Sequence, residues 1–244
     1  MVDITTEDGV CDAYVAEPDG DGPHPAVLFF QDAIGMRQRI QDMADRIASH
    51  GYVVLAPNLF YRSGRAPVVA NLDELLKAGD RQKLMEAVFP IARALKPADA
   101  MRDTRHYLGY LASRSRGPVG VTGYCMGAGL ALRAAGTYPD RVAAAGGFHG
   151  GNLASDAPDS PHLLADQVSA ELYFGHADAD PSMPPEQMER LNAALDAAGV
   201  RYRAEVYEGA MHGYTMADTR VHNESGEQRH WDALLDLFQR TLKA

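Results

Sequence analysis

Short apolar runs, most of them bounded by glycine or proline, recur along the chain. They cover residues 26–30, 52–56, 118–122, 142–145, 170–174 and 202–207, and the last of them alternates with polar positions. Runs of this length predict strands that are buried on both faces, as in a mostly parallel sheet. The segment before them, residues 2–16, predicts an antiparallel start to this sheet.

Amphipathic helices are predicted between the runs. Over residues 36–47, apolar side chains recur at helical spacing, and Gly51 follows where it can end a helix. Similar patterns predict helices over residues 99–113, 126–136, 185–199 and 227–242. The alternation of strands and helices favours an α/β sandwich with right-handed crossovers, in which helices flank the sheet.

The chain is predicted to form one domain over residues 1–244. No composition shift indicates a linker, and undivided α/β domains of this length are common. Residues 61–98 fit the alternation badly, and we interpret them as an inserted cap of short helices.

The composition argues against some classes of partner and indicates the compartment of the protein. Lys plus Arg is 23 and Asp plus Glu is 33, which gives a net charge of −10 and argues against nucleic-acid or membrane partners. The two cysteines, Cys11 and Cys125, cannot build a disulfide framework. The N-terminus lacks the basic and apolar parts of a signal peptide, and no apolar run is long enough to span a bilayer. We expect a cytoplasmic protein.

The strongest motif is a strand, a sharp turn and a helix over residues 118–129. The turn reads Gly123-Tyr124-Cys125-Met126-Gly127, which is a nucleophile elbow with cysteine in the nucleophile position. Glycines two residues before and after Cys125 are expected because the helix passes close to the strand there. A thiol at a helix N-terminus is favoured as thiolate.

An elbow of this kind predicts an acid after a later strand and a histidine near the C-terminus. His212 lies in a glycine-flanked loop after the last predicted strand. Asp178 and Asp180 follow the strand at 170–174, in an acidic loop. In this interpretation His212 takes the thiol proton and an Asp fixes the tautomer of its imidazole.

In this order, the motifs resemble those of the dienelactone hydrolase family, or carboxymethylenebutenolidase-like proteins, of the α/β-hydrolase fold. The matching segments are 30–35, 57–60, 123–127, 180–184 and 209–213. The resemblance implies that Cys125 is the nucleophile and His212 the base. It also implies hydrolysis of small lactones or carboxylic esters, the type reaction being conversion of a dienelactone to maleylacetate.

The resemblance leaves two candidates for the acid. Asp180 keeps the family's spacing of four residues before a proline, here Pro184, whereas Asp178 fits the general habit of the fold. We favour Asp180. The oxyanion hole is expected to use the backbone N–H groups of Met126 and Ala33.

The chain departs from the family pattern at two positions. Asp32 replaces a glutamate that contacts the resting thiol in the type enzyme, and its side chain is about 1.5 Å shorter. Asp32 either activates the thiol or caps the helix that begins near Met36. Met216 stands where the type enzyme has an arginine that binds the substrate carboxylate, so Arg81 is a candidate for substrate binding.

The leading interpretation is therefore a monomeric hydrolase, without cofactor or metal, that forms an acyl-Cys125 intermediate. One alternative is a thiol-based redox protein that uses Cys125 alone; it predicts a resolving cysteine, and Cys11, in the N-terminal strand region, is poorly placed to be one. Others are a non-catalytic interaction protein and a metallohydrolase built on His176, Asp178 and Asp180. The sequence does not identify the natural substrate.

Overall fold

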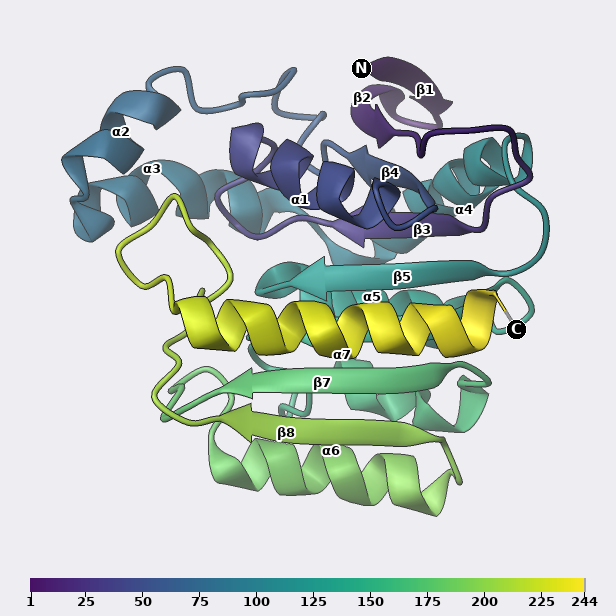
Figure 1. Cartoon of the computed structure of the whole chain (residues 1–244). Helices are drawn as coiled ribbons and strands as arrows, with labels where there is room; N and C mark the ends of the chain where they lie inside the picture. Colours follow the sequence, from purple (N-terminus) through teal and green to yellow (C-terminus); the bar gives the residue numbers. More distant parts are fainter. Residues whose placement is uncertain (244) are drawn as a thin grey trace.

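The computed structural model describes residues 1–243. One eight-stranded sheet runs through it in the order β1-β2-β4-β3-β5-β6-β7-β8 (Figure 1). The strands are β1 (Val2–Thr6), β2 (Gly9–Ala16), β3 (Ala26–Phe30), β4 (Val53–Pro57), β5 (Val119–Tyr124), β6 (Val142–Phe148), β7 (Glu171–Ala177) and β8 (Tyr202–Tyr207). β2 pairs antiparallel with β1 and β4, and all the other pairs are parallel. The expected fold class is confirmed.

Helices cover both faces of the sheet (Figure 1). α1 (Gln38–Ala48) and α7 (Glu224–Leu242) pack on one face. α4 (Pro97–Ala112), α5 (Met126–Thr137), the 3₁₀ helix η1 (Pro161–Gln167) and α6 (Pro185–Ala197) lie on the other. The helix expected over 227–242 begins earlier, because the Asn223 side chain accepts a hydrogen bond from the Gly226 N–H at 2.8 Å and caps it. The 3₁₀ helix was not predicted.

The strands form two apolar cores because their side chains alternate between the two faces. In β3 every residue is buried: Val27 and Phe29 join the core under α1 and α7, and Leu28 and Phe30 join the core under α4 and α5. A strand buried on both faces needs apolar residues at every position. This is why residues 26–30 form a continuous apolar run.

Residues 61–98 include two helices that the alternating pattern did not resolve. α2 (Leu72–Ala78) and α3 (Arg81–Ala94) lie at the end of the molecule toward which the parallel strands point (Figure 1). Leu72, Leu84 and Val88 form a small apolar cluster between them. This segment therefore lies beside the carboxyl edge of the sheet, where α/β proteins bind their ligands.

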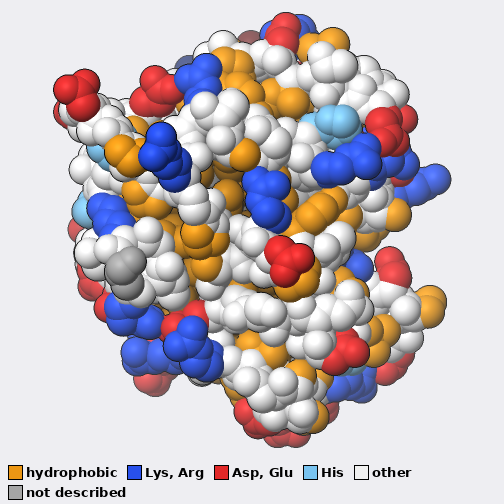
Figure 2. Space-filling view, turned by 90° about the vertical axis from the view of Figure 1, so that its right-hand side faces the viewer, with side chains coloured by type: hydrophobic (Ala, Val, Ile, Leu, Met, Phe, Trp, Pro, Cys, Tyr) orange, Lys and Arg blue, Asp and Glu red, His pale blue; other side chains and the backbone are white. Residues whose placement is uncertain are grey.

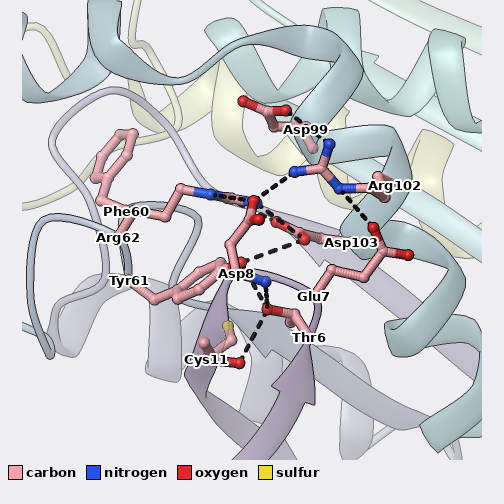
Figure 3. A network of polar contacts seen from close by, with 12 residues as sticks. Thr6, Glu7, Asp8, Cys11, Phe60, Tyr61, Arg62, Asp99, Arg102 and Asp103 are labelled. Atoms are coloured by element: carbon pink, nitrogen blue, oxygen red, sulfur yellow. Dashed lines mark hydrogen bonds and ion pairs between the residues drawn. The ribbon is translucent and has the colours of Figure 1, made fainter.

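An ionic network joins the β1–β2 hairpin to α4 (Figure 3). Arg62 donates to Asp8 at 2.6 Å and to Asp103 at 2.8 Å, and the Tyr61 hydroxyl hydrogen-bonds Thr6 at 2.7 Å. Cys11 is fully buried nearby, and burial raises the pKa of its thiol to about 12. A thiol in this state is a poor nucleophile.

The end of the molecule where the parallel strands begin, opposite to α2 and α3, carries charges of both signs. Figure 2 shows Lys and Arg side chains interspersed there with Asp, Glu and hydrophobic side chains. A shallow cleft at this end includes Arg141, Arg201 and Arg240, two of which contact Glu171. Such mixed charge differs from the concentrated positive surface that polyanions require. Within residues 1–243, no helix has the length and apolar character needed to cross a bilayer.

Candidate active site

Cys125 occupies a strained turn between β5 and α5. Its backbone has φ 55° and ψ −118°, a region that residues other than glycine rarely adopt. The Cys125 N–H donates to the Phe148 carbonyl at 3.1 Å, which joins the turn to the end of β6. Strain of this kind persists only where the surrounding structure fixes it, and it clusters at functional sites.

Two glycines make the turn possible. A Cβ atom at Gly123 would lie 1.9 Å from the Gly127 carbonyl oxygen, and one at Gly127 would lie 2.4 Å from the Phe30 carbonyl oxygen. Both obstacles are backbone atoms, so they cannot turn aside as a flexible side chain could. The close approach of α5 to β5 and to the loop after β3 therefore depends on glycine at both positions.

We expect Gly123→Ala to destabilise the fold by about 3 kcal/mol or more, because the methyl group overlaps backbone. Gly129→Ala is the matched control, since a Cβ there would meet Pro161 at an ordinary 3.6 Å. The control should remain within about 1 kcal/mol of the parent, because alanine also favours the helix. Denaturant unfolding of both variants measures the difference, and equal stabilities would contradict the account of the turn.

His212 contacts both Cys125 and Asp180. Its Nε2 lies 3.1 Å from the Cys125 Sγ, and its Nδ1 lies 2.6 Å from the Asp180 Oδ2. The Asp180 Oδ1 accepts hydrogen bonds from the Ser182 N–H at 2.9 Å and the Ser182 hydroxyl at 2.7 Å. The structure thus brings the predicted thiol, imidazole and carboxylate into one continuous chain of contacts.

The contacts of His212 favour a proton on its imidazole. Burial alone would lower the pKa of His212, but its contacts with Asp180 and Cys125 raise it to about 10. Burial would raise the pKa of Asp180, and the hydrogen bonds from His212 and Ser182 outweigh that effect and lower it. The protonation of His212 therefore contributes to the stability of the fold. This contribution is fully present below pH 6.5, the ordinary pKa of histidine, and is lost as pH rises through about 10.

Asp178 points elsewhere. Its Oδ2 accepts a hydrogen bond from the Gly209 N–H at 2.9 Å, and its own N–H donates to the Ala210 carbonyl at 2.8 Å. His176 is buried and stacks on Phe174, with ring centroids 6.0 Å apart. Of the two acid candidates, the structure brings only Asp180 to His212. In the described part of the chain, no three His, Cys, Asp or Glu side chains form a group that could hold a metal ion.

A cavity of about 160 Å³ opens beside Cys125 and His212. Ala33 and Arg81 are among the residues that line it, and Met126 is the first residue of α5, directly after Cys125. The N–H groups of a first helical turn lack partners within the helix. The apolar part of the wall consists of Ile34, Leu75, Leu76, Leu84, Met85, Phe89, Met216 and Val221.

Asp32 borders this cavity but forms an ion pair with Arg37. The Arg37 Nη1 and Nη2 atoms donate to the two Asp32 carboxylate oxygens at 2.7 Å and 3.0 Å, and the Ile34 N–H donates to the same carboxylate at 3.0 Å. The helix-cap interpretation of Asp32 is wrong, because α1 begins at Gln38 and its N-cap residue is Arg37. The contacts also direct Asp32 to Arg37 rather than to the thiol.

Three residues at the site were missed by sequence reasoning: His149, Arg37 and Asp218. The His149 ring is fully buried, lies edge-on to the His212 ring at 5.4 Å and contacts the Thr215 hydroxyl at 2.8 Å. Its position directly after β6, at the carboxyl edge of the sheet, was a usable signal. Arg37 and Asp218 lie far apart in sequence, and no local pattern relates them.

Comparisons with known proteins identify the family of the chain. The model of the dienelactone hydrolase family matches residues 11–242. A Yersinia pestis protein, provisionally named a carboxymethylenebutenolidase, is 32% identical and its alignment covers 93% of this chain and 82% of that protein. A Synechocystis protein with the same provisional name is 27% identical over 100% of this chain and 97% of its own length.

A solved structure from Klebsiella pneumoniae, provisionally described as a dienelactone hydrolase, has the same fold. Its TM-score is 0.83 at 24% identity, and the alignment covers 98% of this chain and 96% of that one. The family model spans nearly the whole chain and includes every segment of the site. The chain therefore belongs to the dienelactone hydrolase family and is a dienelactone hydrolase-like hydrolase of the α/β-hydrolase fold.

Proposed function

We propose that the chain hydrolyses small lactones or carboxylic esters through an acyl intermediate on Cys125. The observation that carries the proposal is the contact chain from Asp180 through His212 to Cys125, at 2.6 Å and 3.1 Å, beside the cavity. Cysteine and histidine at this separation form an activated nucleophile and its proton carrier. The family supplies the class of reaction.

In the first half of the reaction the Cys125 thiolate attacks the carbonyl carbon and forms a C–S bond. The carbonyl π electrons move to the oxygen, and the N–H groups of Ala33 and Met126 are proposed to stabilise this oxyanion. The oxyanion then collapses, the C–O bond breaks and His212 gives its proton to the leaving alkoxide. In a lactone, the new hydroxyl remains attached to the acyl group.

In the second half, water attacks the acyl carbon and His212 takes its proton. The C–S bond breaks, the acid leaves and the thiolate–imidazolium pair is restored. Asp180 keeps the imidazole oriented throughout, with Nδ1–H toward its carboxylate and Nε2 toward the thiol. Every proton is accounted for by His212 and water, so the reaction needs no cofactor.

We propose that the chain is a single domain and acts as a cytoplasmic monomer. In this domain, α2 and α3 complete the wall of the cavity. Leu75 and Leu76 of α2 and Arg81, Leu84, Met85 and Phe89 of α3 border it. Small substrates with an apolar part suit this wall, and Arg81 is proposed as a substrate-binding residue. Size-exclusion chromatography with light scattering tests the oligomeric state.

A panel of lactones, p-nitrophenyl esters and thioesters tests the function. We expect hydrolysis of at least one class and complete loss of activity when one iodoacetamide molecule alkylates Cys125. Cys11 should remain unmodified in the folded protein, because it is buried and its thiol pKa is about 12. Full activity after alkylation of Cys125 would contradict the proposal, because Cys125 could not then be the nucleophile.

A further inference from the structure

The Arg37 side chain lies between two loops that border the cavity. The first, residues 31–35, follows β3 and carries Ala33. The second, residues 213–219, follows His212. The Arg37 side chain is 3% exposed, so its N–H groups must find their partners within the protein.

Arg37 holds both loops through paired contacts. Besides its two bonds to Asp32, it donates from Nε and Nη2 to the two Asp218 carboxylate oxygens at 2.6 Å and 3.2 Å. The guanidinium also donates to the Gly35 carbonyl at 3.0 Å and contacts the Met216 sulfur at 3.4 Å. Bidentate contacts on two sides fix distance and orientation, which the point charge of a lysine cannot do.

The arrangement also determines where the Asp32 carboxylate points. Asp32 is 4% exposed and borders the same cavity as Cys125. Without Arg37 it would be a buried carboxylate without a cationic partner, which is costly and would favour rearrangement of its loop. The Ile34 N–H bonds to the same carboxylate, so movement of Asp32 would shift the backbone next to Ala33.

We propose that Arg37 is a positioning residue for acyl transfer, which fixes the loop of Ala33 against the loop of His212 through Asp32 and Asp218. The inference rests on the proposed function, because the Ala33 N–H acts there as an oxyanion donor. Such donors work only when held in place before the reaction, since a misplacement on the order of 1 Å costs about 100-fold in rate. Arg37 itself is not among the residues that line the cavity.

The test compares Arg37→Met with Arg62→Met. Arg62 also bridges two aspartates, Asp8 and Asp103, but in the hairpin network (Figure 3) and not at the cavity. Two rates are measured: kcat on a p-nitrophenyl ester, and alkylation of Cys125 by iodoacetamide, which forms no oxyanion. Both are expressed per folded molecule.

We expect Arg37→Met to lower kcat by about 100-fold, while the alkylation rate and KM change little. Arg37→Lys should give an intermediate kcat, because it keeps the charge without the paired contacts. Arg62→Met should lower the melting temperature and leave kcat unchanged. Wild-type kcat in Arg37→Met, or an equal fall of kcat and alkylation, would overturn the proposal.

Hydrogen–deuterium exchange gives a readout that does not depend on any substrate. Peptides covering residues 31–36 and 213–219 should exchange faster in Arg37→Met than in wild type, and at wild-type rate in Arg62→Met. Equal exchange in the two variants would overturn the positioning role even if the hydrolase function failed. Should Arg37→Met not fold, Asp218→Asn replaces it: Asp218 is 26% exposed, and faster exchange with lower kcat is expected.

Discussion

Replacing Cys125 with alanine is expected to lower kcat for ester hydrolysis by about 10⁴-fold or more. Alanine removes the only proposed nucleophile, and no other thiol borders the cavity in the described residues. The backbone N–H groups proposed for the oxyanion remain, so substrate binding should survive. KM for the residual activity and the melting temperature should therefore stay close to the wild-type values.

Cys11→Ala is the matched control. Cys11 is fully buried beside Tyr107, so truncation should cost about 1 kcal/mol of stability by leaving a small void. Its turnover per folded molecule should equal that of wild type. A large loss of turnover in Cys11→Ala, with activity kept in Cys125→Ala, would contradict the assignment of Cys125 as the nucleophile.

Asp180→Asn should lower kcat by about 10⁴-fold although it preserves the shape of the side chain. The Asp180 Oδ1 accepts two hydrogen bonds from Ser182, so the amide oxygen of asparagine must occupy that position. Its NH₂ group then faces the His212 Nδ1, which must accept a hydrogen bond instead of donating one. The proton moves to Nε2, and His212 can no longer take a proton from the thiol.

Asp178→Asn tests whether this effect is specific to Asp180. The Asp178 Oδ2 accepts one hydrogen bond from the Gly209 N–H, and the amide oxygen of asparagine can accept the same bond. Turnover should therefore be unchanged. Steady-state kinetics on the two variants separates the candidate acids, and a loss confined to Asp178→Asn would assign the acid to Asp178.

The strands and most helices were predictable from the sequence because the strands are buried on both faces and the helices on one. Residues 26–30 are apolar throughout, as burial on both faces requires, every residue of β5 is buried, and α1 keeps its apolar side chains on one side. The individual helices within residues 61–98 were not predicted, because α2 and α3 pack mainly on each other and along the cavity. Their small shared core gives a weaker periodic signal than packing on the sheet.

Much of the candidate site was predictable because the fold brings motifs together in a fixed order. The elbow at Cys125 and the loops of Asp180 and His212 each follow a strand of the parallel sheet, so their side chains meet at its carboxyl edge. The pairing of Asp32 with Arg37 was not predictable. Nor was the contact of Arg37 with Asp218, which exists only once the loops after β3 and after His212 lie side by side.

Intact-protein mass spectrometry can detect the proposed acyl group on Cys125. Wild type is mixed with a p-nitrophenyl ester and quenched in acid within the first turnovers, because thioesters survive acid. We expect one added acyl group, located after trypsin digestion in the peptide of residues 117–133 and absent from Cys125→Ala. Ongoing hydrolysis with no acyl group on that peptide, or an acyl group on the peptide of residues 1–37 that contains Cys11, would contradict it.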